Sequence, residues 1–384
     1  MSRVPRVPVF LASVPASSQL PQRAHFLCQA LLASGRSCLH VDIPLRRAPL
    51  AWLRHPRGPA HVLRPSLASA RSWWSLPESE QRKRALQQGR RLRRRLHARY
   101  DPERLVAIVE TPQWLPWLEG LGIEHVVYDR IDEVAAHAPR PETQQQLESW
   151  ECELIDRCSA AVVSSSVLAQ PIRARRPELP LCRIPNGVDL ETFERLARAE
   201  TAPPELARLP RPRVGFVGAL YHWLDVELID AVTAALPNIQ FVFIGPAQAA
   251  HTPTPRANVL QLGPVPHERV PTCIAGFDLC WLPFRNDAVG RGANPVKLYE
   301  YLALGKPVVT TPLADLDEFG GLVSVGESAE EITQLLRQGL TEADSSLYEK
   351  RLALARDCSW ERRADALLEF IDEFAGPAAS AKRR

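Results

Sequence analysis

The sequence lacks several features that would place it in a common functional class. No stretch reaches about 18 apolar residues, so we expect no transmembrane helix. No Gly-x-Gly-x-x-Gly is present, which disfavours a nicotinamide dinucleotide and makes an oxidoreductase the least favoured class. The eight cysteines show no Cys-x-x-Cys spacing and fit a reducing cytoplasm. Thiols expected to be buried in apolar runs are Cys28, Cys38, Cys158 and Cys280.

Lysine is scarce: only five of the 47 basic residues are lysine, so Lys297 and Lys306 stand out. The basic residues are also unevenly distributed. Residues 1–100 contain 19 Lys or Arg against three acidic residues, a net charge of +16, which leaves −13 for the other 284 residues. Such asymmetry indicates an anionic partner, either lipid head groups or polyanionic glycans.

Short apolar runs alternate with helical patterns along the whole chain. The run near the N-terminus resembles a signal peptide in part, but the α/β pattern that continues it favours a strand. At 384 residues two domains are expected, and the alternation predicts two Rossmann-like parallel α/β domains facing a cleft. Predicted strands are 7–12, 38–43, 105–110, 126–128, 160–164, 181–184, 213–217, 239–245, 259–263, 279–284, 307–311 and 322–325. Predicted helices include 23–33, 81–99, 114–121, 143–158 and 296–304.

The most informative stretch is residues 294–311. Pro295 opens a helix, Gly305 ends it, and a buried strand follows. Lys297 and Glu300 are three residues apart and therefore share one face of the helix. The cation suits a phosphate and the carboxylate suits the neighbouring hydroxyls of a ribose, so this end of the helix is expected to bind a nucleotide diphosphate. The alternative is an ordinary ion pair on a solvated face.

This stretch resembles the signature of GT-B glycosyltransferases, specifically the family-4-like nucleotide-sugar enzymes of the bacterial teichuronic-acid and exopolysaccharide subgroup. The run from Asn186 to Phe193 is similar to the hallmark that ends the first domain of these enzymes. The first Glu of the family signature falls at Gly292, which supplies no carboxylate for the donor sugar. Matching residues are Pro295, Glu300, Gly305, Pro307, Val308 and Val309.

The resemblance implies a glycosyltransferase that retains anomeric configuration and uses no metal or cofactor. Its donor is expected to be a UDP- or GDP-sugar, and its acceptor a lipid-linked glycan or a polysaccharide. Lys297 is then the catalytic cation that stabilises the leaving diphosphate. Expected nucleotide contacts are Gly218, Val265, Asn294, Val296 and Glu300. The Arg and Lys that relatives carry after Gly218 are missing here, so the phosphate candidates are Arg285, Arg291 and Lys297. The loop 285–293 is expected either to cover the phosphates or to be a plain surface loop.

The acceptor side is expected in the first domain, where relatives place a His that falls at Ile131 here. Asp132 is therefore the catalytic candidate that contacts the acceptor or takes its proton. The alternative for Asp132 is a helix cap or a loop hydrogen bond. Arg23, His25 and Arg130 are further acceptor-side candidates, and a solvated helix start is the alternative for the first two.

We expect the following division of the chain. Residues 1–190 form the acceptor domain, with a basic insertion at about 44–100, and 191–212 form a linker. Residues 213–358 form the nucleotide-sugar domain. Residues 359–375 form a helix that returns to the first domain, and 376–384 form a disordered tail.

The basic segment between Arg82 and Arg99 has nine Lys or Arg and no acidic residue. A helix of this kind, with Trp52, Trp73 and Trp74 upstream, is typical of contact with an anionic membrane surface. It would place the protein in the cytoplasm at the inner face of the membrane. The alternative is a solvated basic helix. Nucleic-acid binding is not expected, because no nucleic-acid-binding module accompanies the charge.

Two other functions remain open at this stage. One is a nucleotide-sugar epimerase on the same fold, which would consume donor without acceptor and release no free sugar. The other is a non-catalytic nucleotide-sugar-binding scaffold, which is suggested by Gly292 and Ile131 at positions where relatives have polar groups. Such a scaffold would bind donor without turnover.

Overall fold

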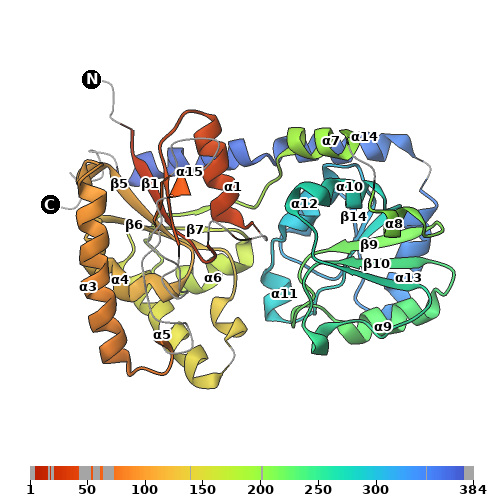
Figure 1. Cartoon of the computed structure of the whole chain (residues 1–384), viewed down its shortest axis with the longest axis horizontal. Coiled ribbons are helices and arrows are strands. Elements are labelled where there is room, and N and C mark those ends of the chain that lie inside the picture. The colour runs from red at the N-terminus through yellow and green to blue at the C-terminus, as the bar shows by residue number, and fades with distance from the viewer. Residues whose placement is uncertain are drawn as a thin grey trace. The chain divides into compact units, whose positions relative to one another are not determined.

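The computed structural model describes residues 5–15, 18, 21–42, 53–54, 61–63, 73–138, 140–199, 202–342 and 344–375. Contacts divide the chain into two units. Unit 1 is Met1–Pro185 with Arg363–Arg384, and unit 2 is Asn186–Arg362. Each unit is built on one sheet of parallel strands with helices packed against it (Figure 1), so the predicted α/β class is confirmed.

The sheet of unit 1 has the strand order β3-β4-β2-β1-β5-β6-β7-β8. All neighbouring strands run parallel except β3 and β4. Every residue of β1, β5 and β7 is buried, as expected for a parallel sheet covered on both faces. The strands are β1 Val7–Leu11, β2 Leu39–Val41, β3 Leu53–Arg54, β4 His61–Leu63, β5 Leu105–Val109, β6 His125–Arg130, β7 Ala160–Val163 and β8 Leu181–Arg183.

The helices of unit 1 confirm the predicted ones to within a few residues. The four cysteines expected to be buried are buried, and none of the eight forms a disulfide. The α-helices are α1 Arg23–Ala33, α3 Glu78–His97, α4 Leu115–Leu121, α5 Pro141–Arg157 and α6 Ser166–Arg175. The 3₁₀ turns are η1 Pro102–Arg104, η2 Pro112–Trp114 and η3 Val134–His137.

The basic helix α3 packs closely on α4 at two glycines. A Cβ on Gly89 would lie 2.6 Å from the carbonyl oxygen of Trp117, and one on Gly120 would lie 2.4 Å from that of Leu86, so the two backbones are in contact. Trp73 is buried and stacks on Trp117, with ring centroids 4.8 Å apart. The expected aromatic membrane anchor is therefore wrong for Trp73, because its ring fills the core. Trp52 lies outside the described residues.

Unit 2 has a fully parallel sheet with the order β11-β10-β9-β12-β13-β14. Its strands are β9 Arg213–Val217, β10 Gln240–Ile244, β11 Val259–Gly263, β12 Leu279–Leu282, β13 Val308–Thr310 and β14 Val323–Val325. Its α-helices are α7 Leu190–Ala199, α8 Pro204–Ala207, α9 Val226–Ala235, α10 Val270–Ala275, α11 Ala288–Gly292, α12 Val296–Leu302, α13 Ala329–Leu340 and α14 Ser345–Asp357. Its 3₁₀ turns are η4 Ala249–His251, η5 His267–Arg269 and η6 Leu316–Phe319.

The segment 191–212, predicted to be a linker, has helical structure. It contains most of α7 and all of α8. Phe193 and Leu206 are buried in the apolar core of unit 2, so burial of these two side chains fixes the segment to that unit. The change of unit in the chain falls earlier, between Pro185 and Asn186.

The last helix, α15 Trp360–Phe374, begins in unit 2 and ends in unit 1. Ser359 caps it, with its Oγ accepting from the Arg362 N–H. At the other end the Phe374 ring lies edge-on to His125, with centroids 6.2 Å apart. Residues 376–384, predicted to be a disordered tail, lie outside the described residues. Within the described part of the chain, no helix combines the length and apolar character needed to cross a bilayer.

Candidate functional site

In unit 2, Lys297 and Glu300 form an ion pair on α12, with Nζ and Oε2 3.0 Å apart. The Glu300 side chain is only 1% exposed and that of Lys297 is 26% exposed, so the alternative of a pair on a solvated face is wrong for Glu300. The second carboxylate oxygen, Oε1, is buried and accepts no hydrogen bond from any residue that the structure describes. A buried carboxylate oxygen without a hydrogen-bond donor can accept a hydrogen bond from a ligand hydroxyl.

Two sets of hydrogen bonds hold α12 in place. The Tyr301 hydroxyl accepts from the Val217 N–H at the end of β9, at 2.9 Å. The side-chain oxygen of Asn294 accepts from the Asn186 N–H at 2.8 Å, and its amide nitrogen lies 2.8 Å from the Tyr299 hydroxyl. The Asn294 side chain thus fixes the start of the helix, and its predicted contact with a nucleotide stays a prediction.

His267 is a residue of this site that the sequence does not reveal. Burial lowers the pKa of its imidazole, against the opposing charge of Glu300, so the ring is neutral at pH 7. The positive charge of Lys297 also lowers the pKa of this imidazole. The only sequence signal is that His267 follows the turn after β11.

The remaining donor-side candidates lie around the carboxyl edge of the same sheet. Gly218 follows β9 directly, and a Cβ there would lie 2.8 Å from the Phe216 ring, so the position is suited to glycine. Val265 lies two residues before η5, and Val296 is the first residue of α12. Both are half-buried. Their predicted contacts with a nucleotide stay predictions.

The two arginine candidates bind within their own loop. Arg285 pairs with Asp287 at 3.0 Å and is 54% exposed, and Arg291 Nε donates to Asn286 at 2.8 Å. The loop is partly helical, because it contains α11, which Asp287 caps through the Gly290 N–H. These exposed, weakly held guanidinium groups stay candidates for a phosphate.

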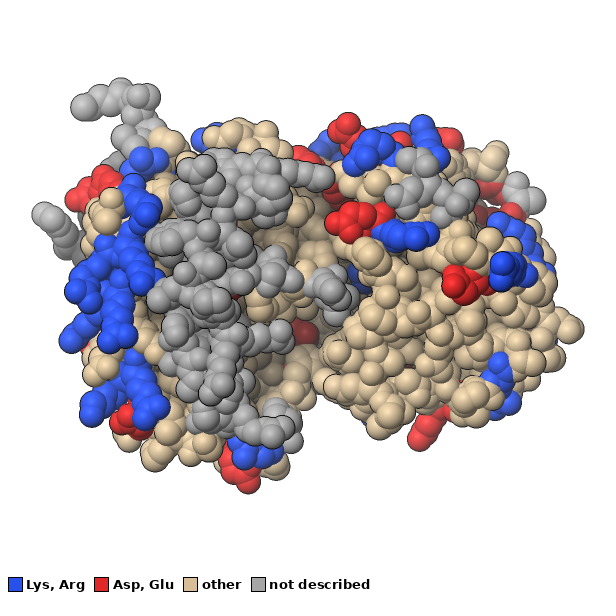
Figure 2. Space-filling view, in the orientation of Figure 1, with Lys and Arg blue, Asp and Glu red and all other residues tan. Residues whose placement is uncertain are grey.

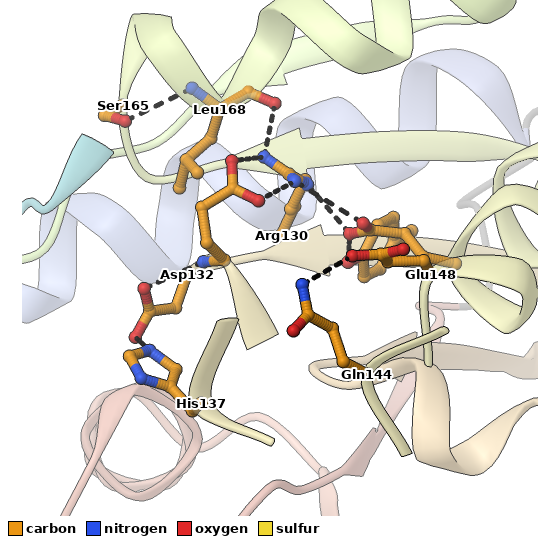
Figure 3. A network of polar contacts seen from close by, with 10 residues as sticks. Arg130, Asp132, His137, Gln144, Glu148, Ser165 and Leu168 are labelled. Atoms are coloured by element: carbon orange, nitrogen blue, oxygen red, sulfur yellow. Dashed lines mark hydrogen bonds and ion pairs between the residues drawn. The ribbon is translucent and has the colours of Figure 1, made fainter. Parts of the chain in front are cut away.

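In unit 1, Asp132 follows β6 and makes two local hydrogen bonds (Figure 3). Its Oδ1 accepts from the Glu133 N–H at 2.8 Å, and its Oδ2 lies 2.8 Å from Nε2 of His137. The loop hydrogen bond that the sequence offers as an alternative is therefore present. The carboxylate nevertheless remains 43% exposed, so it is also open to a ligand. His137 lies at the end of η3, six residues after Ile131.

Arg130 lies inside unit 1 rather than at an open edge (Figure 3). Its side chain is 2% exposed and pairs with Glu133 and Glu151, and Nη1 also donates to the Leu168 carbonyl. Burial disfavours its charge, but the hydrogen bonds that Arg130 donates to these carboxylates, together with their negative charge, outweigh burial and keep the pKa of Arg130 above its ordinary value. We therefore assign it a structural role in place of an acceptor contact.

Arg23 and His25 are buried at the start of α1, so the alternative of a solvated helix start is wrong. Arg23 Nε donates to Asp129 at 2.8 Å, and Nη1 donates to the Pro185 carbonyl at 3.2 Å. His25 Nδ1 accepts from the Gln22 N–H at 3.1 Å, which leaves Nε2 to donate to the Pro15 carbonyl at 3.0 Å. His25 thus holds the chain that follows β1.

Comparison with known proteins agrees with this architecture. Residues 211–341 match the family described as Glycosyl transferases group 1. A curated relative, the putative teichuronic acid biosynthesis glycosyltransferase TuaH of Bacillus subtilis (strain 168), is 27% identical over 180 residues. That alignment covers 44% of this chain and 44% of the relative, so it spans less than half of either protein.

Solved structures resemble the whole chain. The α,α-trehalose 6-phosphate synthase of Burkholderia multivorans has a TM-score of 0.71 at 12% identity, covering 98% of this chain and 100% of that one. The trehalose-6-phosphate enzyme of E. coli, solved with UDP-2-fluoro glucose, has a TM-score of 0.68 at 13% identity, covering 97% and 99%. These likenesses establish the GT-B fold and nothing further.

Proposed function

We propose that the protein is a sugar-nucleotide-dependent glycosyltransferase, because residues 211–341 match the family described as Glycosyl transferases group 1 and the whole chain resembles solved GT-B structures. Its donor is a UDP- or GDP-sugar. Its acceptor is a lipid-linked glycan or a polysaccharide of the bacterial cell surface, in keeping with the teichuronic acid relative. We further propose transfer with retention, without a metal, in the cytoplasm.

The proposal rests chiefly on the hydrogen bonding of the Glu300 carboxylate. Its Oε2 is held by Lys297 while its buried Oε1 has no partner among the described residues. Two adjacent ribose hydroxyls would supply the missing donors. The Lys297 ammonium, fixed at the same place, would then face the diphosphate and stabilise the charge that develops as it leaves.

The direct test is transfer of labelled sugar from each of a panel of UDP-, GDP-, ADP- and TDP-linked donors to a bacterial membrane lipid extract. We expect incorporation from one nucleotide class. Binding of donor without turnover in the presence of extract would instead indicate a scaffold. Consumption of donor without extract, with no free sugar released, would indicate an epimerase.

We propose that Asp132 takes up the acceptor proton and that His137 positions it. Asp132→Asn is then expected to lower the transfer rate by about 10²-fold, because the amide has lost the basicity of the carboxylate. Donor binding should not change, because Asp132 belongs to unit 1. His137→Gln should lower the rate less and alter its pH profile. Asp156→Asn, a change at a surface carboxylate, is the control. Equal rates in Asp132→Asn and the control would remove Asp132 from the mechanism.

Support for contact with an anionic membrane comes from the exposed side of α3. Figure 2 shows Lys and Arg side chains gathered along α3. Its apolar residues Ala85, Leu92 and Leu96 are buried within unit 1 and Leu86 is half-buried, so contact with lipid would be mainly electrostatic. Arg82 and Arg84 pair with glutamates one turn earlier. The exposed cations further along α3 are Arg90, Arg91 and Arg94.

We expect the protein to sediment with vesicles containing phosphatidylglycerol at low salt. Each of these three cations should contribute about 1 kcal/mol, so replacing all three by Glu should abolish sedimentation. The matched control replaces three exposed arginines of unit 2 by Glu, namely Arg256, Arg337 and Arg356. Sedimentation that survives the change on α3, or that the control loses equally, contradicts the hypothesis.

A further inference from the structure

Three polar side chains converge where strands of the unit 1 sheet end. Ser13 follows β1, Glu110 follows β5 and Asp129 lies near the end of β6. Strand β1 has β2 and β4 on one side and β5 to β8 on the other, so the chain changes direction across the sheet between β1 and β5. In open parallel sheets, ligands bind at the carboxyl ends of the strands beside such a switch point.

Glu110 and Asp129 point to the same face of this sheet. Strands β5 and β6 are in parallel register with Val109 opposite Tyr128, so the next pair is Glu110 and Asp129. Paired residues of neighbouring parallel strands project to one side. Arg23 reaches the same place from α1 and bonds Asp129 at 2.8 Å.

In each of the two carboxyl groups, one oxygen accepts hydrogen bonds and the other accepts none from the described residues. Glu110 Oε2 accepts from both the N–H and the hydroxyl of Ser13, at 2.9 and 3.0 Å, and Asp129 Oδ2 accepts from Arg23. Glu110 Oε1 and Asp129 Oδ1 are buried and accept nothing from the residues that the structure describes. Both side chains are fully buried, so an unmet acceptor is costly unless a ligand or water donates to it.

The charges of the cluster indicate a neutral ligand. Arg23 balances Asp129. Burial, with the nearby charge of Asp129, raises the pKa of Glu110 to about 7, so this carboxyl exchanges its proton near neutrality. The groups that face Glu110 are Asp129 on β6, Arg23 and Cys28 on α1, and Ser13 after β1. A phosphate would be repelled by the carboxylates, whereas hydroxyl groups carry no charge and can donate to both oxygens.

We propose that Glu110 Oε1 and Asp129 Oδ1 form a subsite that binds hydroxyl groups of the acceptor sugar. The inference rests on the proposed function and names the part of the acceptor that unit 1 recognises. Ser13, which bonds Glu110, is half-buried at this edge. Neither Glu110 nor Asp129 is among the acceptor-side residues that the sequence predicts.

The bonds to Ser13 make Glu110→Gln a specific probe. The Ser13 N–H can only donate, so in this variant the amide oxygen must face Ser13 and the amide NH₂ takes the place of Oε1. The variant therefore replaces an open acceptor by a donor with almost no change of shape. Protonation of Glu110 has the same effect, because the proton must sit on the oxygen that Ser13 does not use.

The experiment measures binding of methyl glycosides of glucose, galactose and mannose by saturation-transfer NMR, with the full chain at pH 6 and pH 8. At least one glycoside should bind the unmodified protein about 10-fold more weakly at pH 6 than at pH 8, where Glu110 is ionised. In Glu110→Gln binding should be about 10-fold weaker than in the unmodified protein at pH 8 and should not change with pH. The control Glu119→Gln makes the same chemical change on an exposed residue of α4 and should behave as the unmodified protein.

His25 and His40 bond the chain that follows β1 near this edge, but they are unchanged in Glu110→Gln, so a flat pH profile assigns the effect to Glu110. No binding of any glycoside, or equal binding in Glu110→Gln, overturns the subsite. If Glu110→Gln does not fold, the pH comparison is made on His25→Gln and His40→Gln. A 10-fold change that persists in both assigns the effect to Glu110, and its loss in either overturns that assignment. Binding of UDP or GDP, measured in the same samples, tests the donor site of the proposed function separately.

Discussion

Glu300→Ala is expected to abolish the stabilisation of the protein by its donor nucleotide. A ligand that binds only the folded state at 100 times its Kd adds about 2.7 kcal/mol to the free energy of unfolding. The alanine variant removes both oxygens of Glu300, including the one that has no protein partner and is left for the ribose. Thermal unfolding in the presence of UDP, GDP, ADP and TDP would show a shift with one of them in the native chain and none in the variant.

The control for this measurement is Glu349→Ala, which removes an exposed carboxylate of α14 in the same unit. It should keep the full nucleotide shift. Because Glu300→Ala also frees Lys297 from its ion pair, both variants are compared first without nucleotide. A nucleotide shift that persists in Glu300→Ala would remove this residue from the donor site, and the absence of any shift in the native chain would count against the proposed function.

Much of the fold follows from local patterns in the sequence. The predicted bounds of α1, β9 and β11 agree with the structure, because each is a continuous apolar or amphipathic run with a clear stop. Strands β3 and β4 were not predicted. They contain two and three residues, too few to show a period of two, and they lie in a segment rich in Pro and Arg.

The candidate site was predictable only where its residues are close in sequence. Lys297 and Glu300 are three residues apart, so helical spacing alone places them together. The partners Arg23 and Asp129 are 106 residues apart, and Asn186 and Asn294 are 108 apart. Contact between such residues depends on the order of the strands and on which helix covers which face of the sheet. Local periodicity in the sequence predicts neither.

The same dependence on strand order hides the pair of buried acids. Asp132 and Glu110 both follow a strand, and local sequence alone gives no reason to pair Glu110 with Asp129. Only the sheet order shows that Glu110 lies at the switch point and that its neighbour in register is another acid. The packing of segment 191–212 is hidden in the sequence for a related reason, since burial of Phe193 and Leu206 depends on the rest of unit 2.

Arg130→Met is expected to destabilise unit 1 by about 3–5 kcal/mol, because it removes one side of a buried ion-pair network. The Arg130 side chain is 2% exposed and lies between Glu133 and Glu151. Glu151 also accepts from the Tyr128 hydroxyl. Without the guanidinium, these carboxylates keep their charge near an apolar methionine, and the Leu168 carbonyl loses its donor. Hydrogen exchange of the β6 and β7 amides would report the loss of stability within unit 1.

The chain contains a matched comparison on its surface. Arg82 also lies between two glutamates, Glu78 and Glu153, at 2.7 Å from each, but its side chain is 37% exposed. Water can solvate the two carboxylates once the guanidinium is removed. Arg82→Met should therefore lower the free energy of unfolding by less than about 1 kcal/mol. Both variants remove a guanidinium held by two carboxylates, so the difference between their losses of stability measures the effect of burial. Similar losses of exchange protection in the two variants would show that the buried network is no more important to unit 1 than an exposed ion pair.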